Sequence, residues 1–254
     1  MSKKLASGSD VILLDVKFGS GAFMKNVDDA IALAELMVKI GENAGKTVGA
    51  LITSMQQPLG DKAGNSLEIL SVIDLLKGEK SRLFTEVTEV AVKLILLSKF
   101  AKDERQAEEM VEKAISSGEA FKRFVKMVEL HGGDTSYILN PEKFELGKIA
   151  PIYAKASGYI SKINTEAIGT AIVYLGGGRE QKTDIIDNSV GVHMKTALGD
   201  FVEKGQNIVD IYHQTKGLDM AINLIDNAFV ITKDKPAPYK IAEAYVDIKG
   251  VCRY

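Results

Sequence analysis

Apolar runs and amphipathic stretches alternate in the first part of the chain. An apolar, branched run at residues 11–16 is bounded by glycines and predicts a buried strand. Residues 27–44 carry apolar positions at helical spacing, and Asn26, followed by Asp29, predicts the N-cap of that helix. A second apolar run at residues 47–54 predicts another buried strand. A strand, a helix and a strand at this spacing predict a βαβ unit with parallel strands and a right-handed crossover.

The next segment, residues 65–130, has helical periodicity throughout. Residues 87–100 are almost all apolar, which predicts a buried helix. Residues 107–115 and 119–130 alternate charged and apolar faces and predict two amphipathic helices.

Beyond Pro151 the pattern changes to short strands separated by glycine, aspartate and lysine. Strands are expected at residues 152–156, 158–163, 191–195, 206–213, 228–231 and 241–246, and helices at 166–175 and 217–226. The predicted fold is an α/β partial sheet with helices over residues 1–148, followed by an α+β C-terminal domain over residues 149–254. Because two parallel strands rarely form a stable sheet alone, we expect either a fragment or a chain that completes its sheet with another polypeptide.

Composition narrows the class of protein. The 254 residues carry a formal net charge of -2, which gives no general reason to expect nucleic-acid or anionic-membrane binding. The single cysteine, Cys252, excludes an intrachain disulfide and fits a reducing cytoplasm. No apolar stretch reaches the length of a membrane span. We therefore expect a cytoplasmic protein with no nucleic-acid or membrane partner.

Candidate chemistry is concentrated in the loop at residues 17–25, which has the sequence KFGSGAFMK and joins the first strand to the first long helix. Ligands bind at the carboxyl ends of strands in open α/β sheets, and glycines let backbone amides approach them. The loop lacks the third glycine of a dinucleotide motif and the ending of a P-loop, so a tight structural turn is the competing interpretation. Phe23 and Met24 either fold into the core or face a ligand. The three histidines lack the spacing of metal ligands and are interpreted as surface or hydrogen-bonded side chains.

The C-terminal part contains two segments that resemble the barrel-sandwich modules of biotinyl and lipoyl carriers. These are ASGYISKI at residues 156–163 and GDFVEKGQNIVDI at residues 199–211. No lysine follows the second segment where a carrier would place its swinging lysine, so we interpret the module as a scaffold. A carrier protein remains an alternative, and it predicts a mass addition of biotin or lipoate.

Several motifs in fixed order resemble pyrimidine-nucleoside and thymidine phosphorylases. They are MSKKLASGSDVILLDVKFGSGAFMK, SMQQPLGDKAGNSLEIL, HGGD, ASGYISKI, KTDIIDNSVGV and GDFVEKGQ. The resemblance implies a helical domain, an α/β domain and a C-terminal domain with a barrel-sandwich core, assembled as a homodimer. It implies a pentosyltransferase that cleaves uridine or thymidine with phosphate as co-substrate and without a cofactor.

The resemblance also implies roles for particular residues. Lys3 corresponds to a lysine that hydrogen-bonds the pyrimidine, and Phe23 to a phenylalanine that lines the base pocket. In some members a monovalent or divalent cation is held at the positions of Leu59, Lys62 and Ser71. Here Lys62 adds a positive charge and Ser71 lacks a carboxylate, so we expect this cation site to be degraded.

In the family pattern, the phosphate-binding segments and further base-binding residues precede the position of Met1. We therefore expect the C-terminal portion of a phosphorylase, in which residues 1–8 are a remnant of the helical domain and no catalytic residue is retained. Such a chain is expected to be inactive or dependent on a partner. The alternative is a non-catalytic structural or binding subunit of a split phosphorylase that pairs with a separate N-terminal half.

Overall fold

The computed structural model describes residues 1–254, and these divide into two compact units. The first unit comprises Met1–Gln56, Phe84–Lys113 and Lys240–Tyr254, and the second comprises Gln57–Leu83 and Ala114–Tyr239. The end of the chain thus lies in the first unit, and residues 57–83 lie in the second.

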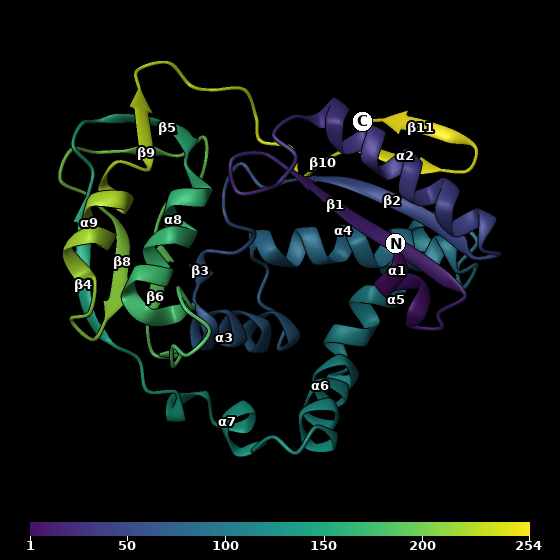
Figure 1. Ribbon diagram of the computed structural model, residues 1–254, viewed down its shortest axis with the longest axis horizontal. Coiled ribbons are helices and arrows are strands. Elements are labelled where there is room, and N and C mark those ends of the chain that lie inside the picture. The colour runs from purple at the N-terminus through teal and green to yellow at the C-terminus, as the bar shows by residue number, and fades with distance from the viewer. The chain divides into compact units, whose positions relative to one another are not determined.

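A four-stranded sheet forms the centre of the first unit, with the strand order β1-β2-β10-β11. Its strands are β1 (Val11–Phe18), β2 (Thr47–Ser54), β10 (Ala242–Asp247) and β11 (Gly250–Arg253). β1 and β2 are parallel, which confirms the predicted βαβ unit (Figure 1). β10 runs antiparallel to β2 and pairs with β11, so the predicted strand near residues 241–246 belongs to this sheet.

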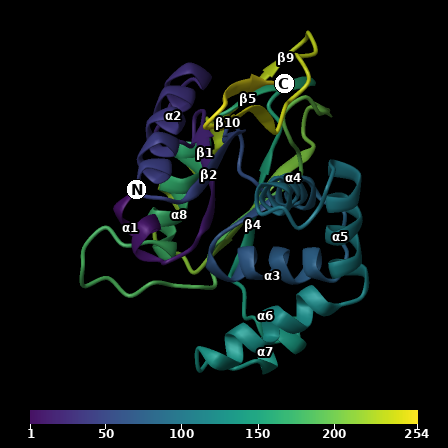
Figure 2. The ribbon, with the colours of Figure 1, turned by 90° about the vertical axis from the view of Figure 1, so that its right-hand side faces the viewer.

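Helix α2 (Val27–Asn43) connects β1 to β2 and covers one face of this sheet, as Figure 2 shows. The predicted cap is confirmed, since the Asn26 side chain accepts a hydrogen bond from the backbone N–H of Asp29 at 2.9 Å. The helix contributes small and branched side chains to a core shared with β1, β2 and β10; its buried members are Ala30, Ile31, Ala34 and Val38. Alternate residues of β1 therefore point into this core, and the others point to the opposite face.

The remaining helices of the N-terminal half are mostly half-buried. They are α1 (Ser2–Ala6), α3 (Asn65–Leu76), α4 (Arg82–Leu97), α5 (Glu104–Ser116) and α6 (Glu119–Leu130). The prediction of a buried helix at residues 87–100 was wrong, because Val87 and Leu94 are 41% and 40% exposed. Helix α4 carries apolar side chains on more of its faces than the neighbouring elements cover. No helix in the chain combines the length and apolar character that a membrane crossing needs.

Two antiparallel sheets lie at the centre of the second unit, which also includes α3 and α6. One sheet has the order β3-β6-β8-β4 and the other β7-β5-β9. The strands are β3 (Lys62–Ala63), β4 (Lys148–Tyr153), β5 (Gly158–Ile163), β6 (Gly191–Met194), β7 (Phe201–Val202), β8 (Asn207–His213) and β9 (Phe229–Thr232). Its further helical segments are α7 (Ser136–Leu139), η1 (Pro141–Lys143), α8 (Thr165–Ile172), η2 (Val173–Gly177) and α9 (Leu218–Asp226).

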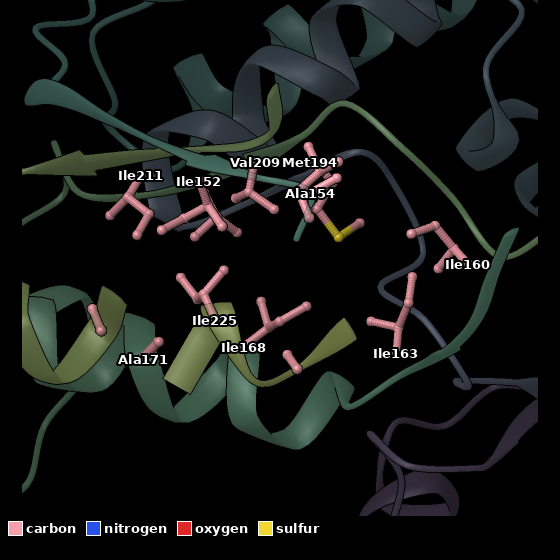
Figure 3. Packing of buried hydrophobic residues seen from close by; sticks show 14 of the residues in the cluster. Ile152, Ala154, Ile160, Ile163, Ile168, Ala171, Met194, Val209, Ile211 and Ile225 are labelled. Carbon is pink, nitrogen blue, oxygen red and sulfur yellow. The ribbon is translucent and has the colours of Figure 1, made fainter. Parts of the chain in front are cut away.

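One hydrophobic core joins these elements. Ile152, Val209 and Ile211 point from the sheet toward Ile168 of α8 and Ile225 of α9 (Figure 3). Ile160 and Ile163 of the second sheet belong to the same core. Helices with mixed sheets confirm the α/β character of the chain, and neither of these two sheets closes into a barrel.

We expect the second unit to depend on this core. Ile160 is 0% exposed, so Ile160→Ala should lower the free energy of unfolding by roughly 2 to 5 kcal/mol through lost burial and a residual cavity. Urea unfolding followed by circular dichroism measures the change. The matched control is Ile185→Ala, because Ile185 is 92% exposed. Equal losses for the two variants would contradict the assigned core.

Candidate functional site

The glycine loop after β1 is fixed by backbone hydrogen bonds to the end of β2. The N–H of Gly21 donates to the carbonyl of Met55 at 3.0 Å, and the N–H of Met55 donates to the carbonyl of Phe18 at 2.6 Å. Gly19 has a φ of +118°, and a Cβ there would lie 2.8 Å from the backbone nitrogen of Gln56. Only glycine fits this close approach, so the loop is a tightly held turn at the carboxyl ends of two parallel strands.

Phe23 and Met24 are neighbours in this loop, but their side chains lie in different environments. Met24 packs against the core of the first unit, whereas Phe23 is 93% exposed. Phe23 lines a pocket of about 710 Å³, together with residues 12–17 of β1 and with Leu33 and Met37 of α2. Phe23 therefore does not fold into the core. The aromatic ring stands at the rim of an open pocket beside β1.

The two lysines of α1 differ in their relation to this pocket. Lys4 lines it, and Lys3, the residue that the resemblance selected, is not among the lining residues. Both side chains are exposed on a short helix. Neighbouring residues of a helix point in directions about 100° apart, which is why only one of an adjacent pair faces a given pocket.

A network of charged side chains lies on the face of β1 opposite α2. Lys17 Nζ lies 2.8 Å from Asp15 Oδ2 and also forms an ion pair and hydrogen bond with Glu86 of α4. The hydroxyl of Thr53 on β2 donates to Asp15. Glu86 is only 4% exposed, so its charge depends on Lys17 for compensation. Sequence reasoning missed this network, because Glu86 is one of two acidic residues in a largely apolar helix and its partner Lys17 lies 69 residues away.

The residues predicted to hold a cation lie in the second unit and have other partners. The carbonyl of Leu59 accepts a hydrogen bond from Arg82 Nε at 3.1 Å. Lys62 Nζ pairs with Asp74 Oδ2 at 3.0 Å, and the buried hydroxyl of Ser71 has no hydrogen-bond partner. Hard cations prefer several oxygen ligands that include carboxylates. A donor set with an ammonium group, a guanidinium-bound carbonyl and a neutral hydroxyl does not fit such an ion.

Asp61, which lies just before Lys62, begins a chain of polar contacts that includes His193 of β6. His193 Nε2 lies 3.1 Å from Asp61 Oδ2, and His193 Nδ1 lies 2.9 Å from Lys195 Nζ. The hydrogen bond from His193 lowers the pKa of Asp61, against the opposing effect of partial burial. Lys195 in turn lies 3.1 Å from Asp210 Oδ2. No cluster of three or more histidine, cysteine, aspartate or glutamate side chains with the geometry of a metal site is present.

Comparison with known proteins gives two family matches. Residues 1–121 match the glycosyl transferase family a/b domain, and residues 159–232 match the pyrimidine nucleoside phosphorylase C-terminal domain.

Individual relatives agree with these matches. A pyrimidine-nucleoside phosphorylase of Staphylococcus epidermidis is 42% identical over 240 residues, which cover 94% of this chain and 55% of the relative. A pyrimidine-nucleoside phosphorylase of Staphylococcus aureus is 38% identical over 249 residues, which cover 97% of this chain and 58% of the relative. A pyrimidine-nucleoside phosphorylase of Geobacillus stearothermophilus is 42% identical over 221 residues, which cover 86% of this chain and 51% of the relative. The chain thus spans about half the length of the curated relatives that it matches.

Glu86→Gln should destabilise the first unit, because it removes a buried charge that compensates Lys17. The expected loss is roughly 1.5 to 3 kcal/mol in the free energy of unfolding, measured by urea denaturation. Glu109→Gln is the control, since Glu109 forms an exposed ion pair with Arg105 within α5 and should contribute less than about 0.5 kcal/mol. A loss for Glu86→Gln as small as that of the control would show that the network is not stabilising.

The lowered pKa of Asp61 predicts a pH dependence of stability. A carboxylate whose pKa is lower in the folded than in the unfolded state stabilises above the unfolded value, and that contribution is lost as the pH falls through the folded value. Asp61→Asn should therefore be less stable than the parent at pH 7, and the difference should narrow below about pH 4. Urea midpoints at pH 7 and pH 3.5 measure it. In a His193→Gln background most of this pH-dependent difference should disappear, and its persistence would assign the effect to another group.

Proposed function

The chain belongs to the pyrimidine-nucleoside phosphorylase family, and from this premise we propose that it forms part of an enzyme that cleaves pyrimidine nucleosides with phosphate. The products would be the free base and ribose or deoxyribose 1-phosphate. The observation that carries the proposal is the exposed ring of Phe23, which lies in the loop after the carboxyl end of β1 and lines the pocket along this strand. Ligands of open α/β sheets bind at such strand ends.

In this proposal Phe23 forms one wall of the base site. A flat aromatic ring at a pocket rim can stack on a pyrimidine, and base–aromatic stacking contributes about 1 to 3 kcal/mol per base. The departing base gains negative charge as the glycosidic bond breaks, and a nearby cation stabilises that charge. Lys3 is assigned this role by the resemblance, while Lys4 is the lysine that lines the pocket. Both belong to α1, so the proposal assigns the cation to this helix.

The proposal includes a further strand along the open edge of β1. β1 pairs only with β2 and ends the sheet. Parallel strands are usually covered on both sides, and a free strand edge is a ready template for pairing. The pocket is lined by consecutive residues 12–17 of β1, so it follows this edge. The occupant would be a strand from the part of the phosphorylase that this chain does not span, either on one polypeptide or on a separate N-terminal half.

The C-terminal sheets fit the role of a barrel-sandwich scaffold in this enzyme. Both sheets contribute to one core, as strands of such a module would. A carrier role is disfavoured because Lys195, which belongs to the Met194-Lys195 pair that precedes the segment at residues 199–211, is held by His193 and Asp210. On the basis of the resemblance, we also propose that the enzyme assembles as a homodimer. We also propose a cytoplasmic location, which the free thiol of Cys252 fits.

Phosphorolysis of uridine and thymidine tests the proposal. We expect no turnover by the 254-residue chain alone, because positioning of phosphate supplies much of such catalysis and no phosphate-binding residue is identified in it. Mixing or fusing it with the remaining part of the Geobacillus stearothermophilus relative should give turnover. Robust turnover by the chain alone would contradict the expected dependence. A complex that forms without turnover would favour the non-catalytic subunit.

In the active assembly, Phe23→Ala should raise the KM for the nucleoside at least roughly fivefold, the lower limit expected for one lost stacking contact. Phe100→Ala is the control, because Phe100 is also exposed in the first unit but lies outside the pocket. Steady-state kinetics with uridine at saturating phosphate measure both variants. An unchanged KM for Phe23→Ala would remove Phe23 from the base site.

A further inference from the structure

Three consecutive carbonyl oxygens in the second unit face one side chain. Arg82 Nη2 donates to the carbonyls of Pro58 and Gly60 at 2.9 and 2.6 Å, and Arg82 Nε donates to that of Leu59 at 3.1 Å. Successive carbonyls of an extended chain point in alternating directions. Here they converge, so the backbone at residues 58–60 curves around the guanidinium.

Converging carbonyl oxygens form a site of negative potential that suits a cation. A metal ion would use them as ligands, and it would also need carboxylates or waters to complete its shell. A guanidinium is permanently charged and presents several N–H donors in a fixed plane, so it can satisfy several carbonyls at once. Hydrogen bonds from an ionised donor are also stronger than neutral ones.

The surrounding side chains favour the guanidinium over a metal ion. Lys62, two residues after Gly60, brings a second positive charge, which is paired with Asp74. Asp61 points its carboxylate to His193. Ser71, which lies on the same face of α3 as Asp74, offers only a buried hydroxyl without a hydrogen-bond partner. The acidic groups near this loop are therefore engaged with nitrogen donors, and a metal ion would meet two cationic side chains.

We propose that the guanidinium of Arg82 is the resident cation of the 58–62 loop, so that this loop is held by the chain itself and needs no bound metal ion. The inference concerns the folding of the loop and does not depend on the proposed function. It makes the stability of the second unit insensitive to the identity of the cation in solution. It also makes Arg82 a structural residue whose loss loosens residues 59–64.

The first experiment is thermal unfolding of the intact chain in potassium, sodium, magnesium or calcium chloride, against choline chloride with a chelator at equal ionic strength. The midpoint should differ among these salts by less than about 1 °C. A specific ligand at a concentration far above its dissociation constant raises the midpoint by several degrees. Such a rise with one metal ion alone would overturn the proposal.

The second experiment removes the guanidinium. Arg82→Gln should lower the midpoint by roughly 5 °C, because it removes charge-assisted hydrogen bonds to three carbonyls. Hydrogen exchange by mass spectrometry should be at least tenfold faster in the peptide that contains residues 59–64. Arg105→Gln is the matched control, since Arg105 is 80% exposed in its side chain and pairs only with a neighbour on its own helix; it should change neither measurement.

Arg82→Lys provides a second variant if Arg82→Gln does not fold. It keeps the charge but cannot bridge three carbonyls in one plane, so the exchange of residues 59–64 should still rise. Exchange at the parent rate in either variant would show that Arg82 does not hold the loop and would overturn the proposal. Activity of the assembled enzyme is not used as a readout, so a failure here is separate from a failure of the proposed function.

Discussion

The parallel pairing of β1 with β2 determines where the residues of the candidate site lie. The register runs from Val11 opposite Thr47 to Phe18 opposite Ser54, so the two strands end together. Because they end together, the glycine loop after β1 meets the backbone that follows β2, and Gly21 bonds to Met55. The same register places Lys17 opposite Thr53, which brings both strands to the charged network with Glu86. A slip of one residue would turn the apolar face of β1 away from α2 and would dismantle both features.

Much of this unit was predictable, because its signals are local. Branched apolar runs specified β1 and β2, and the cap at Asn26 specified the start of α2. The return of β10 to β2 was not predictable, since its partner lies about 190 residues earlier and no periodicity carries that information. The two-residue strands β3 and β7 were missed because they are shorter than any pattern that alternation can reveal. For α4, the count of apolar residues exceeded what the packing covers, so composition overestimated its burial.

The residues of the candidate site also differ in whether their signals in the sequence are local or depend on distant partners. Phe23 was singled out by the resemblance, whereas the glycine loop alone left burial in the core and contact with a ligand both open. Glu86 and Arg82 were not identifiable, because their partners lie 69 residues away in one case and 22 to 24 in the other. Both are polar side chains at positions where helical periodicity says nothing about the partner. Sequence reasoning therefore located the exposed aromatic residue at the pocket and missed the charged side chains Glu86 and Arg82.

The exposure of Phe23 has an energetic consequence that links the fold to its proposed role. Burying a phenylalanine side chain contributes roughly 1.5 to 3 kcal/mol, and in this chain that contribution is unused. The loop around it cannot relax to bury the ring, because Gly19 and Gly21 are fixed against the end of β2 and Met24 already occupies the core. A stacked pyrimidine or a strand added along β1 would recover the contribution without deforming the loop. The rigidity of the turn and the exposure of the ring thus support the proposed role, in which this apolar surface meets an external partner.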